Sequence, residues 1–555
     1  MNFIFRSLIL TSMLLTACLL FAQQKAMTLK EKINRFAPTV ISADLSKLSQ
    51  GDRKALAKLI DAAKVLDSIY LKQVWSGNTD LLKKLQADKS SSGKEKLHYF
   101  YINMCPWSTL DSNEPFIQGA PNPRPPGANY YPEDMTREEF NAWVASLPEA
   151  EQKKATGFFS VIRRNDNRKL MIVPYNEEYK DLLIHAAKLL KEAAGFTDNA
   201  TLKNFLIKRA DAFLSNNYYE SDVAWMELDS PIEPTIGPYE VYMDDMFNYK
   251  AAFEAFITLR NDAETNKLTK FSSYLQEVEN TLPIDPKYRS PKLGASSPIR
   301  VVDVVATGGE ARAGVQTAAY NLPNDEQVIT EKGSKRVMLK NVMEAKFNKV
   351  LVPIAQIAID KQQLPLVKFD PFFTHILAHE LMHGLGPQNI TILGKQTTVR
   401  ESMRELHSAL EEAKADISGL FMLQYLIDNS KIDKSFEKQM YVTYLAGAFR
   451  SARFGTKDAH GKAMALQFNY LLNEGAFNYD YKSNKFSVNF EKIKRAVKKL
   501  AGQIMTIQAE GRYDLAKALF MQFEVLPPSM NRILKQLTAI PVDIEPKKPG
   551  THNSL

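Results

Sequence analysis

Two histidines four residues apart are the first feature of this sequence that could do chemistry. They are His379 and His383, in the segment HELMHGLGP that ends at Pro387. Residues at this spacing project from one face of a helix, so the two imidazoles can share a metal ion. Glu380 stands beside the first histidine, placed to hydrogen-bond a metal-bound water rather than the metal. The segment therefore predicts a hydrolytic metal site, and the alternative is a polar edge on a core helix.

The flanking residues predict the helix that would carry this motif. Asp370 and Pro371 form a typical helix start, with aspartate as the N-cap and proline at the first position. Gly384, Gly386 and Pro387 predict where the helix ends. We therefore expect both histidines on the last turns of a short helix.

A second helix is predicted to carry a third ligand. The segment LHSALEEAKADISGLFML has apolar residues at helical spacing. Glu412 and Asp416 lie one turn apart on it, so the first can be a ligand and the second can orient a ligating imidazole. Glu411 is a further candidate for orienting an imidazole, and a solvated acidic face is the alternative. Two histidines and one glutamate leave a position open for water, as in a catalytic zinc site, and Co²⁺ or Mn²⁺ could serve in the same ligand set. Four other histidines are expected to be packed or surface residues: His98, His185, His375 and His407.

The N-terminus carries the pattern of a secretion signal. Arg6 precedes an apolar run, from Ser7 to Ala22, that is too short to span a membrane comfortably. Two processing routes stay open. The segment LTAC is similar to a lipobox, which would leave Cys18 lipidated as a membrane anchor, whereas cleavage after Ala22 would release a soluble protein. We expect either a bacterial periplasmic protein or a membrane-anchored lipoprotein.

The composition is that of an ordinary globular protein. The chain has 555 residues, of which 45% are hydrophobic and 24% are charged, so we expect at least two domains. A formal net charge of +8 is modest for this length, and no arginine-rich arm or zinc knuckle is present, so no nucleic-acid partner is expected. Beyond Cys18 the only cysteine is Cys105, so no internal disulfide can form. We expect a monomer or a dimer.

Hydrophobic patterning divides the chain into helical and strand-rich parts. Helical periodicity covers roughly 28–90, 136–226 and 371–525. Between about 231 and 350, four segments rich in β-branched residues are predicted to be strands: IGPYEVYM, RVVDVVAT, KRVMLKN and KVLVPIAQIAI. The C-terminal PVDIEPKKPGTHNSL is proline-rich and polar, and we expect it to fray.

HELMHG and EEAKAD together resemble the motifs of the dipeptidyl peptidase III family of zinc exopeptidases. That family typically has a six-residue HExxGH motif followed by EExxAD or EExxAE. The first motif has five residues here, a form found in some bacterial and plant relatives. The resemblance implies His379, His383 and Glu412 as ligands of one Zn²⁺ per chain, and Glu380 as the general base.

Further similarities to this family extend over roughly 106–475. PWSTLDSNEPFI resembles a segment of its N-terminal lobe. NLPNDEQV and IEPTIGPYEVY resemble segments that hold the free amino end of the peptide, which implies Asn321, Asn324 and Glu233 as substrate-binding residues. AHGKAMALQFNYLLNEGAF resembles the segment with a histidine that stabilises the transition-state oxyanion, which implies His460 as a catalytic residue.

Two positions depart from the family pattern. The catalytic tyrosine of the family, two residues beyond the ammonium-binding glutamate, is Thr235 here. An arginine four residues beyond the oxyanion histidine is Met464 here. Threonine cannot reach as far as tyrosine, so the rate or the substrate range is expected to differ unless Tyr239 or Tyr242 substitutes.

The resemblance also implies the fold. It is α+β, with two lobes around a wide cleft: a mostly helical zinc-bearing lobe, and a mixed lobe with a β-barrel-like core and helices. The expected divisions are a signal peptide at 1–22, the first part of the mixed lobe at 23–257, a helical-lobe insertion at 258–290, the strand-rich part of the mixed lobe at 291–345, the helical zinc-binding lobe at 346–525, and a C-terminal tail at 526–555.

The function implied is a zinc-dependent exopeptidase that releases dipeptides from the free N-terminus of oligopeptides. One alternative is a thermolysin-like zinc endopeptidase, which would not need an ammonium-binding cluster. A second is an envelope protein that binds zinc and peptides with little turnover. The missing tyrosine speaks for this second alternative, whereas the intact Glu380 speaks against it, because a pure binding protein has no need of a base.

Overall fold

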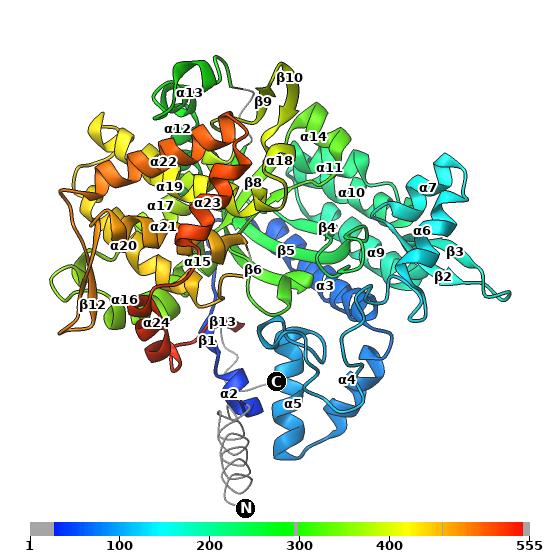
Figure 1. Cartoon of the computed structure of the whole chain (residues 1–555). Coiled ribbons are helices and arrows are strands. Elements are labelled where there is room, and N and C mark those ends of the chain that lie inside the picture. Colours follow the sequence, from blue (N-terminus) through cyan, green and yellow to red (C-terminus); the bar gives the residue numbers. More distant parts are fainter. Residues whose placement is uncertain (1–26, 294–297, 458, 548–555) are drawn as a thin grey trace, which may run out of the picture.

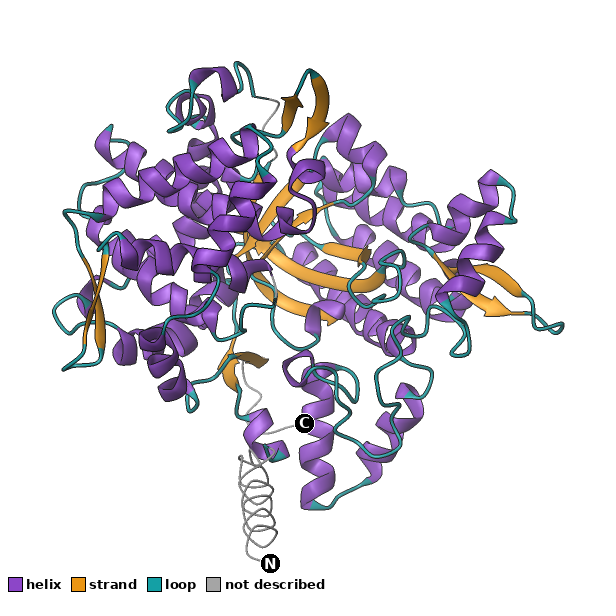
Figure 2. Cartoon of the chain, in the orientation of Figure 1, coloured by secondary structure: helices purple, strands orange, loops and turns teal. Residues whose placement is uncertain are grey.

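The computed structural model describes residues 27–293, 298–457 and 459–547 of the chain (Figure 1). The expected signal peptide at 1–22, with Cys18, lies outside the described residues. Helices dominate, and they flank a central group of strands (Figure 2). Within the described ranges, none of the helices combines the length and the apolar character needed to cross a bilayer.

Buried apolar side chains form two main cores, one for each lobe. The larger core is built almost entirely from helices and includes Leu377, Leu381, Leu410 and Leu420. Its helices are α12 (Asp262–Ser272), α13 (Leu275–Glu279), α16 (Val352–Ala358), α17 (Phe369–Met382), α18 (Val399–Met403), α19 (His407–Asp428), α20 (Phe436–Ala452), α21 (Ala459–Asn473), α22 (Ile493–Ala509), α23 (Tyr513–Phe523) and α24 (Pro528–Leu534). The segment α12–α13, within the expected insertion at 258–290, packs on this helical core.

The second core joins a five-stranded sheet to N-terminal helices. The sheet has the order β4 (Thr235–Glu240), β5 (Ala252–Arg260), β6 (Ile299–Gly309), β8 (Lys335–Leu339), β7 (Ala319–Leu322), and only the β6–β8 pair is parallel. The helices that supply residues to this core are α3 (Gln50–Val74), α6 (Arg137–Ala145), α8 (Tyr175–Glu178), α9 (Lys180–Phe196), α10 (Ala200–Ser215), α11 (Tyr219–Met226), α14 (Glu326–Lys332) and α15 (Lys340–Lys346).

The sheet curls until side chains of its two edge strands meet across its concave face, although these strands do not pair. Thr235 Oγ1 in β4 and Tyr320 Oη in β7 are 2.8 Å apart, although these strands stand at opposite ends of the strand order. Lys335 in β8 donates a hydrogen bond of 2.7 Å to Glu233, which precedes β4. Strand twist accumulates across a sheet, and here it closes the sheet into a half-barrel. The expected α+β fold, with a barrel-like core in the mixed lobe and a separate helical lobe, is confirmed.

The remaining elements lie around these cores. They are α2 (Leu29–Ile33), α4 (Asn78–Ala87), α5 (Ser91–Asn103), α7 (Glu149–Thr156) and the paired strands β1 (Phe36–Val40) with β13 (Asp543–Lys547), β2 (Ser160–Arg164) with β3 (Leu170–Pro174), β9 (Asn389–Ile392) with β10 (Lys395–Thr398), and β11 (Phe477–Asp480) with β12 (Lys485–Val488).

One predicted strand is helical. Three of the four strand segments fall on β4, β6 and β8, but KVLVPIAQIAI forms a π-turn over Phe347–Leu351 followed by α16. The buried residues of this segment are Val350, Leu351, Ile354, Ala355, Ala358 and the C-cap Ile359, and the first five have the spacing of one apolar helical face. Packing of that face into the helical core overrides the β-propensity of valine and isoleucine.

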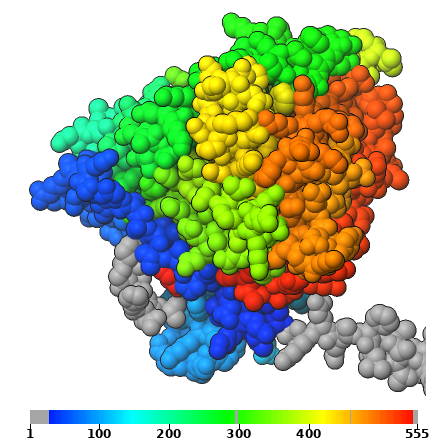
Figure 3. Space-filling view, turned by 90° about the vertical axis from the view of Figure 1, so that its left-hand side faces the viewer, coloured from blue at the N-terminus to red at the C-terminus, as the bar shows by residue number. Residues whose placement is uncertain are grey.

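The C-terminal segment does not fray at its beginning. Residues Asp543–Lys547 form β13, which pairs in parallel with β1 near the other end of the chain. Asp543 is buried and accepts hydrogen bonds from Gln316 N and from Nζ of Lys346, which ends α15, so side-chain contacts also hold this strand in place. Figure 3 shows the first described residues, in blue, beside the last ones, in red. The expectation of a frayed end is therefore wrong for this stretch.

Three carboxylates gather at one end of the half-barrel. Glu254 in β5 lies opposite Gly237 on one neighbouring strand and Gly309 on the other, and Glu310 follows directly. Glu254 is 3% exposed, so its carboxyl group is almost entirely shielded from solvent. Burial raises the pKa of Glu240, of Glu254 and of Glu310, the last to about 8.

We predict that Glu310 makes folding stability pH-dependent. A raised pKa in the folded state means that stability is fully present below the unfolded pKa near 4.5 and is lost as the pH rises through about 8. Glu310→Gln cannot ionise, so it should unfold at a higher temperature than wild type at pH 8.5 and show little difference at pH 4.5. Thermal unfolding across this pH range checks it. Exposed Glu138→Gln is the control, and parallel pH curves for Glu310→Gln and wild type would contradict the prediction.

Candidate metal centre

Helix α17 presents the two histidines at its C-terminal end. It begins at Phe369, before the expected N-cap Asp370: the N-cap is Lys368, whose backbone is extended and whose N–H donates to Thr443 Oγ1 at 3.0 Å. Asp370 lies instead in the first turn, where its negative charge interacts favourably with the positive end of the helix dipole. The last helical residue is Met382, and His383 is the C-cap. The expectation that the pair occupies the last turns is confirmed.

Close packing brings the acidic helix α19 against α17. Gly419 of α19 faces the backbone of Ala378 and His379, and a β-carbon at this position would lie 3.2 Å from His379 N. A larger side chain would therefore push the helices apart. Because the two backbones approach so closely, the carboxylates of α19 reach the imidazoles of α17.

Three candidate ligand atoms converge between these helices. His379 Nε2 lies 3.1 Å from His383 Nε2 and 3.3 Å from Glu412 Oε2. One ligand atom from each of His379, His383 and Glu412 lies within 4.8 Å of the other two, close enough to hold a single metal ion. In the described part of the chain, this is the cluster of metal-ligating side chains that meets this distance. The structure therefore brings together the three residues expected to hold the metal.

Each imidazole has its own carboxylate on the side away from this convergence point. His379 Nδ1 is 2.7 Å from Asp416 Oδ1, and His383 Nδ1 is 3.0 Å from Glu411 Oε1. An N–H at Nδ1 that donates to a carboxylate leaves the Nε2 lone pair free for a metal. The geometry thus places Glu411 and Asp416 where the sequence predicted them, as residues that orient the ligands.

The electrostatics of this group fit a cation. Glu412 Oε2 is buried and accepts no well-formed hydrogen bond, although it faces His379 and lies 2.9 Å from His460 Nδ1. Burial would raise the pKa of Glu412, but the two histidines hold it well below its ordinary value. Burial would lower the pKa of His379, but Asp416 and Glu412 raise it far above its ordinary value. A buried anionic oxygen beside two imidazole nitrogens is a donor set that suits a divalent transition metal.

Glu380 is the carboxylate left without a partner. It is half-buried and makes no hydrogen bond or ion pair with any residue in the described part of the chain. Arg336 of β8 lies within its electrostatic reach: burial lowers the pKa of this arginine, and Glu380 opposes the shift. Arg336 pairs in register with Asn321 of β7, so this corner of the sheet lies near the metal helix. The sequence around Arg336 (SKRVML) gives no signal that would predict a role for this arginine near the metal site.

His460 and Met464 lie on the same helix but in different surroundings. His460 is in the first turn of α21, and its side chain is 70% exposed while Nδ1 approaches Glu412. The carboxylate raises the pKa of His460. Met464 is buried in the helical core, so no charge replaces the arginine of the family at this position. The structure therefore places His460 beside the metal group, as the resemblance implied.

Of the expected ammonium-binding residues, Asn321 lies in β7 and the other two lie just outside strands, where both already have partners. Glu233 is fully buried, with one oxygen accepting from Lys335 Nζ at 2.7 Å and the other lacking a hydrogen bond. Asn324 Nδ2 donates to Tyr239 O at 2.9 Å, whereas Asn321 is exposed on β7. An incoming ammonium would have to share Glu233 with Lys335, and the substrate-binding role of these residues stays a prediction.

The tyrosine that reaches Thr235 is neither of those suggested by the sequence. Tyr239 is buried beneath Arg209, whose guanidinium lies 5.4 Å from the ring centroid, and Tyr242 is largely exposed. Tyr320 places its hydroxyl 2.8 Å from Thr235 Oγ1. Its ring stacks on Phe256 with centroids 4.7 Å apart. Sequence distance hid this pairing, because only the curl of the sheet brings β7 to β4.

Two glutamines complete the support of the histidines. Gln467 of α21 donates to Asp416 Oδ2 at 3.1 Å, and Gln508 of α22 donates to Glu411 Oε2 at 3.0 Å. These bonds fix the carboxylates that hold the imidazoles. His375 is packed, as expected: its Nε2 lies 3.0 Å from Asp416 O and its ring meets Tyr444 edge-on.

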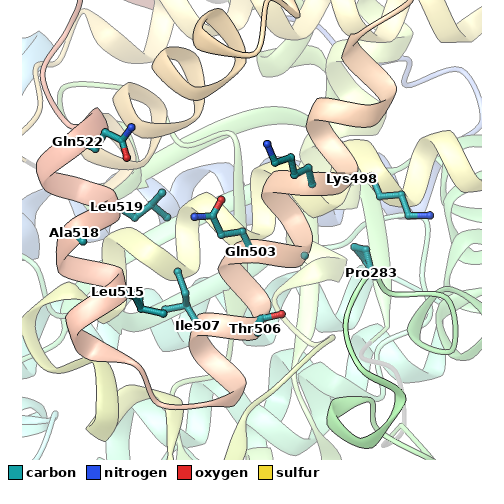
Figure 4. A pocket seen from close by; sticks show the side chains of 11 residues that line it. Pro283, Lys498, Gln503, Thr506, Ile507, Leu515, Ala518, Leu519 and Gln522 are labelled. Carbon is teal, nitrogen blue, oxygen red and sulfur yellow. The ribbon is translucent and has the colours of Figure 1, made fainter.

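A cavity of about 580 Å³ lies elsewhere on the helical lobe. It is open between α22 and α23, and Lys498, Gln503 and Gln522 are among its lining residues (Figure 4). None of the three candidate metal ligands lines it. The cavity is therefore separate from the three candidate metal ligands.

The comparisons with known proteins agree with this geometry. The sequence profile of peptidase family M49 matches residues 131–388. Nudix hydrolase 3 of Arabidopsis thaliana is 42% identical over 96% of this chain and 75% of its own length. The structure of dipeptidyl peptidase III (DPP III) from Caldithrix abyssi is 48% identical, covers 94% of this chain and 99% of its own, and superposes with a TM-score of 0.92. Dipeptidyl-peptidase III from Corallococcus sp. strain EGB is 54% identical over 94% of this chain and 96% of its own, with a TM-score of 0.81.

The fold and the metal centre together define a metallopeptidase. The chain belongs to peptidase family M49, and its structural neighbours are enzymes of the dipeptidyl-peptidase III type. The family resemblance seen in HELMHG and EEAKAD is confirmed. The Nudix name belongs to the plant relative, and part of that protein lies beyond the aligned region.

We predict that loss of either orienting carboxylate weakens metal binding. Glu411→Gln and Asp416→Asn should each raise the metal dissociation constant by roughly 10–100-fold, because the imidazoles lose the acceptor that fixes them. Titration against a competing chelator measures this directly. The control is Asp428→Asn, exposed at the far end of the same helix. Unchanged binding in both orienting variants would contradict the assignment.

Proposed function

We propose that this protein is a zinc-dependent exopeptidase that releases dipeptides from the free N-terminus of oligopeptides. The observation that carries the proposal is the convergence of His379, His383 and Glu412 beside an unpartnered Glu380. The names of the two structural neighbours support dipeptide release as the reaction.

Two imidazole nitrogens and one carboxylate oxygen favour zinc among the biological metals, one ion per chain. When bound, zinc would act as a Lewis acid and lower the pKa of a water molecule. Three protein ligands leave room for that water and for the carbonyl group of the substrate.

Glu380 is the proposed proton carrier. Its carboxylate stands next to a metal ligand, and in the described structure no other side chain competes for it. It would take a proton from the attacking water and pass it to the leaving amine. His460, whose ring approaches Glu412, would donate a hydrogen bond to the oxygen on which negative charge develops.

The half-barrel supplies the proposed peptide-binding surface. β7 is an edge strand, so an extended peptide can add to its free side through backbone hydrogen bonds. Asn321 on this strand, Asn324 after it and Glu233 at the neighbouring edge would receive the ammonium group. A fixed distance from this ammonium site to the metal would set the length of the released product at two residues.

One observation favours a second candidate, a zinc endopeptidase. Glu233 already pairs with Lys335, which weakens its claim on a substrate ammonium. An envelope protein that binds zinc and peptide without turnover is less well supported, because Glu380 is free to act as a base. The remaining expectations stay proposals: oligopeptide substrates and no nucleic-acid partner, export to the periplasm or a lipid anchor at Cys18, and a monomer or dimer.

The first test compares one short peptide with its amino end free or acetylated. We expect wild type to release dipeptides from the free peptide only, and Glu380→Ala to lose about 10²–10⁴-fold in kcat while still binding zinc. Mass spectrometry of the products and a chelator titration provide both readouts. Equal cleavage of both peptides would establish the endopeptidase, and zinc binding without cleavage would establish the binding protein.

We also predict that the hydroxyl of Tyr320 serves the reaction in place of the tyrosine missing at Thr235. Burial holds the pKa of Tyr320 well above its ordinary value, so the phenol keeps its proton and can donate it in a hydrogen bond. Tyr320→Phe should lower kcat by about 10²-fold, the usual cost of losing one donor to a developing oxyanion. Steady-state kinetics with a free-amino peptide measure it.

The matched control for Tyr320→Phe is Tyr130→Phe. Tyr130 is a fully buried tyrosine of the same lobe, and its hydroxyl has no hydrogen-bond partner among the described residues. We expect the control to keep the wild-type kcat. If both variants keep it, Tyr320 only packs against Phe256 and Thr235.

A further inference from the structure

The turn that follows the second histidine is held from two sides by buried charges. This turn, Gly384–Pro387, leaves helix α17 directly after His383. The carbonyl groups at a helix C-terminus have no partner within the helix and must find one elsewhere. Here the partners come from two segments that are distant in the sequence.

Lys414 holds the carbonyl side of the turn. It lies in α19 between Glu412 and Asp416, and its side chain is fully buried. Its ammonium group donates to Leu385 O at 3.1 Å and approaches His383 O at 3.5 Å. It also forms an ion pair of 2.7 Å with Glu411 Oε1.

Glu279 holds the N–H side of the turn. It ends the short helix α13, and it is fully buried. One of its oxygens accepts from Gly386 N at 2.9 Å, and the other accepts from Ser290 N at 2.7 Å. Gly386 has a φ of 74°, and a β-carbon there would lie 3.3 Å from the sulfur of Met505. The backbone at this point therefore has little freedom to move.

These contacts bear on the metal because His383 is the last residue attached to the helix. Its N–H reaches His379 O at 3.3 Å, a long bond that alone restrains the backbone weakly. Glu411 Oε1 touches both Lys414 Nζ and His383 Nδ1, at 2.7 and 3.0 Å. Lys414 thus restrains both the backbone after His383 and the carboxylate that orients its ring.

We propose that Lys414 and Glu279 are positioning residues that clamp the turn Gly384–Pro387 and thereby hold His383 in the geometry for metal binding. Neither touches the convergence point of the ligands, and they act on it from opposite sides of one turn. The choice of zinc as the probe and dipeptide release as a readout rest on the proposed function, whereas the measurement of metal affinity does not.

The test measures zinc affinity separately from folding and from activity. Lys414→Met and Glu279→Gln should each raise the zinc dissociation constant, measured against a competing chelator, by roughly 10–100-fold. Saturating zinc should restore dipeptide release in both variants. Because Glu279→Gln keeps the size of the side chain, it provides a readout if Lys414→Met fails to fold.

The matched control is Lys346→Met. Lys346 is also a buried lysine that donates to a backbone carbonyl, that of Gln316, and to a carboxylate, that of Asp543. The Lys346→Met variant should lose thermal stability without a change in its affinity for zinc. Wild-type zinc affinity in both clamp variants, or an equal loss in Lys346→Met, would overturn the proposal. Wild type that binds zinc but releases no dipeptide would defeat the proposed function and leave the clamp intact.

Discussion

The metal centre depends on how closely two helices approach. Gly419 lets the backbone of α19 lie against that of α17, and this distance decides whether Glu412 reaches His379 and His383. Ligand atoms must lie within a few tenths of an ångström of the positions that a metal requires. Much of the helical core, which packs around these two helices, therefore acts as a support for three side chains.

Charge balance is the second constraint on this site. Glu411, Glu412 and Asp416 place three carboxylates on one short stretch of a largely buried helix, and isolated buried charges are unfavourable. The two imidazoles contact the carboxylates of Asp416 and Glu411 through their Nδ1 atoms. Lys414 supplies a positive charge beside Glu411. A divalent cation at the convergence point would complete the balance.

The mixed lobe contributes through the curl of its sheet. Flat strands would leave β4 and β7 far apart, but here Thr235 meets Tyr320, and Lys335 meets Glu233. Arg336 of the same sheet lies within the electrostatic reach of Glu380 on the helical lobe. A peptide bound along β7 would therefore lie close to residues from both lobes.

Local helical spacing in HELMH and EEAKAD was enough to predict which side chains would gather at the metal centre. A residue four positions along a helix lies on the same face in any fold, so spacing predicted the pairs His379–His383 and Glu412–Asp416, and the family resemblance pointed to Glu412 as the third ligand. Three features follow from tertiary contacts instead: the helical form of KVLVPIAQIAI, the strand β13, and the contact between Thr235 and Tyr320. Each depends on contacts between segments far apart in the chain, and local propensity carries no information about such contacts.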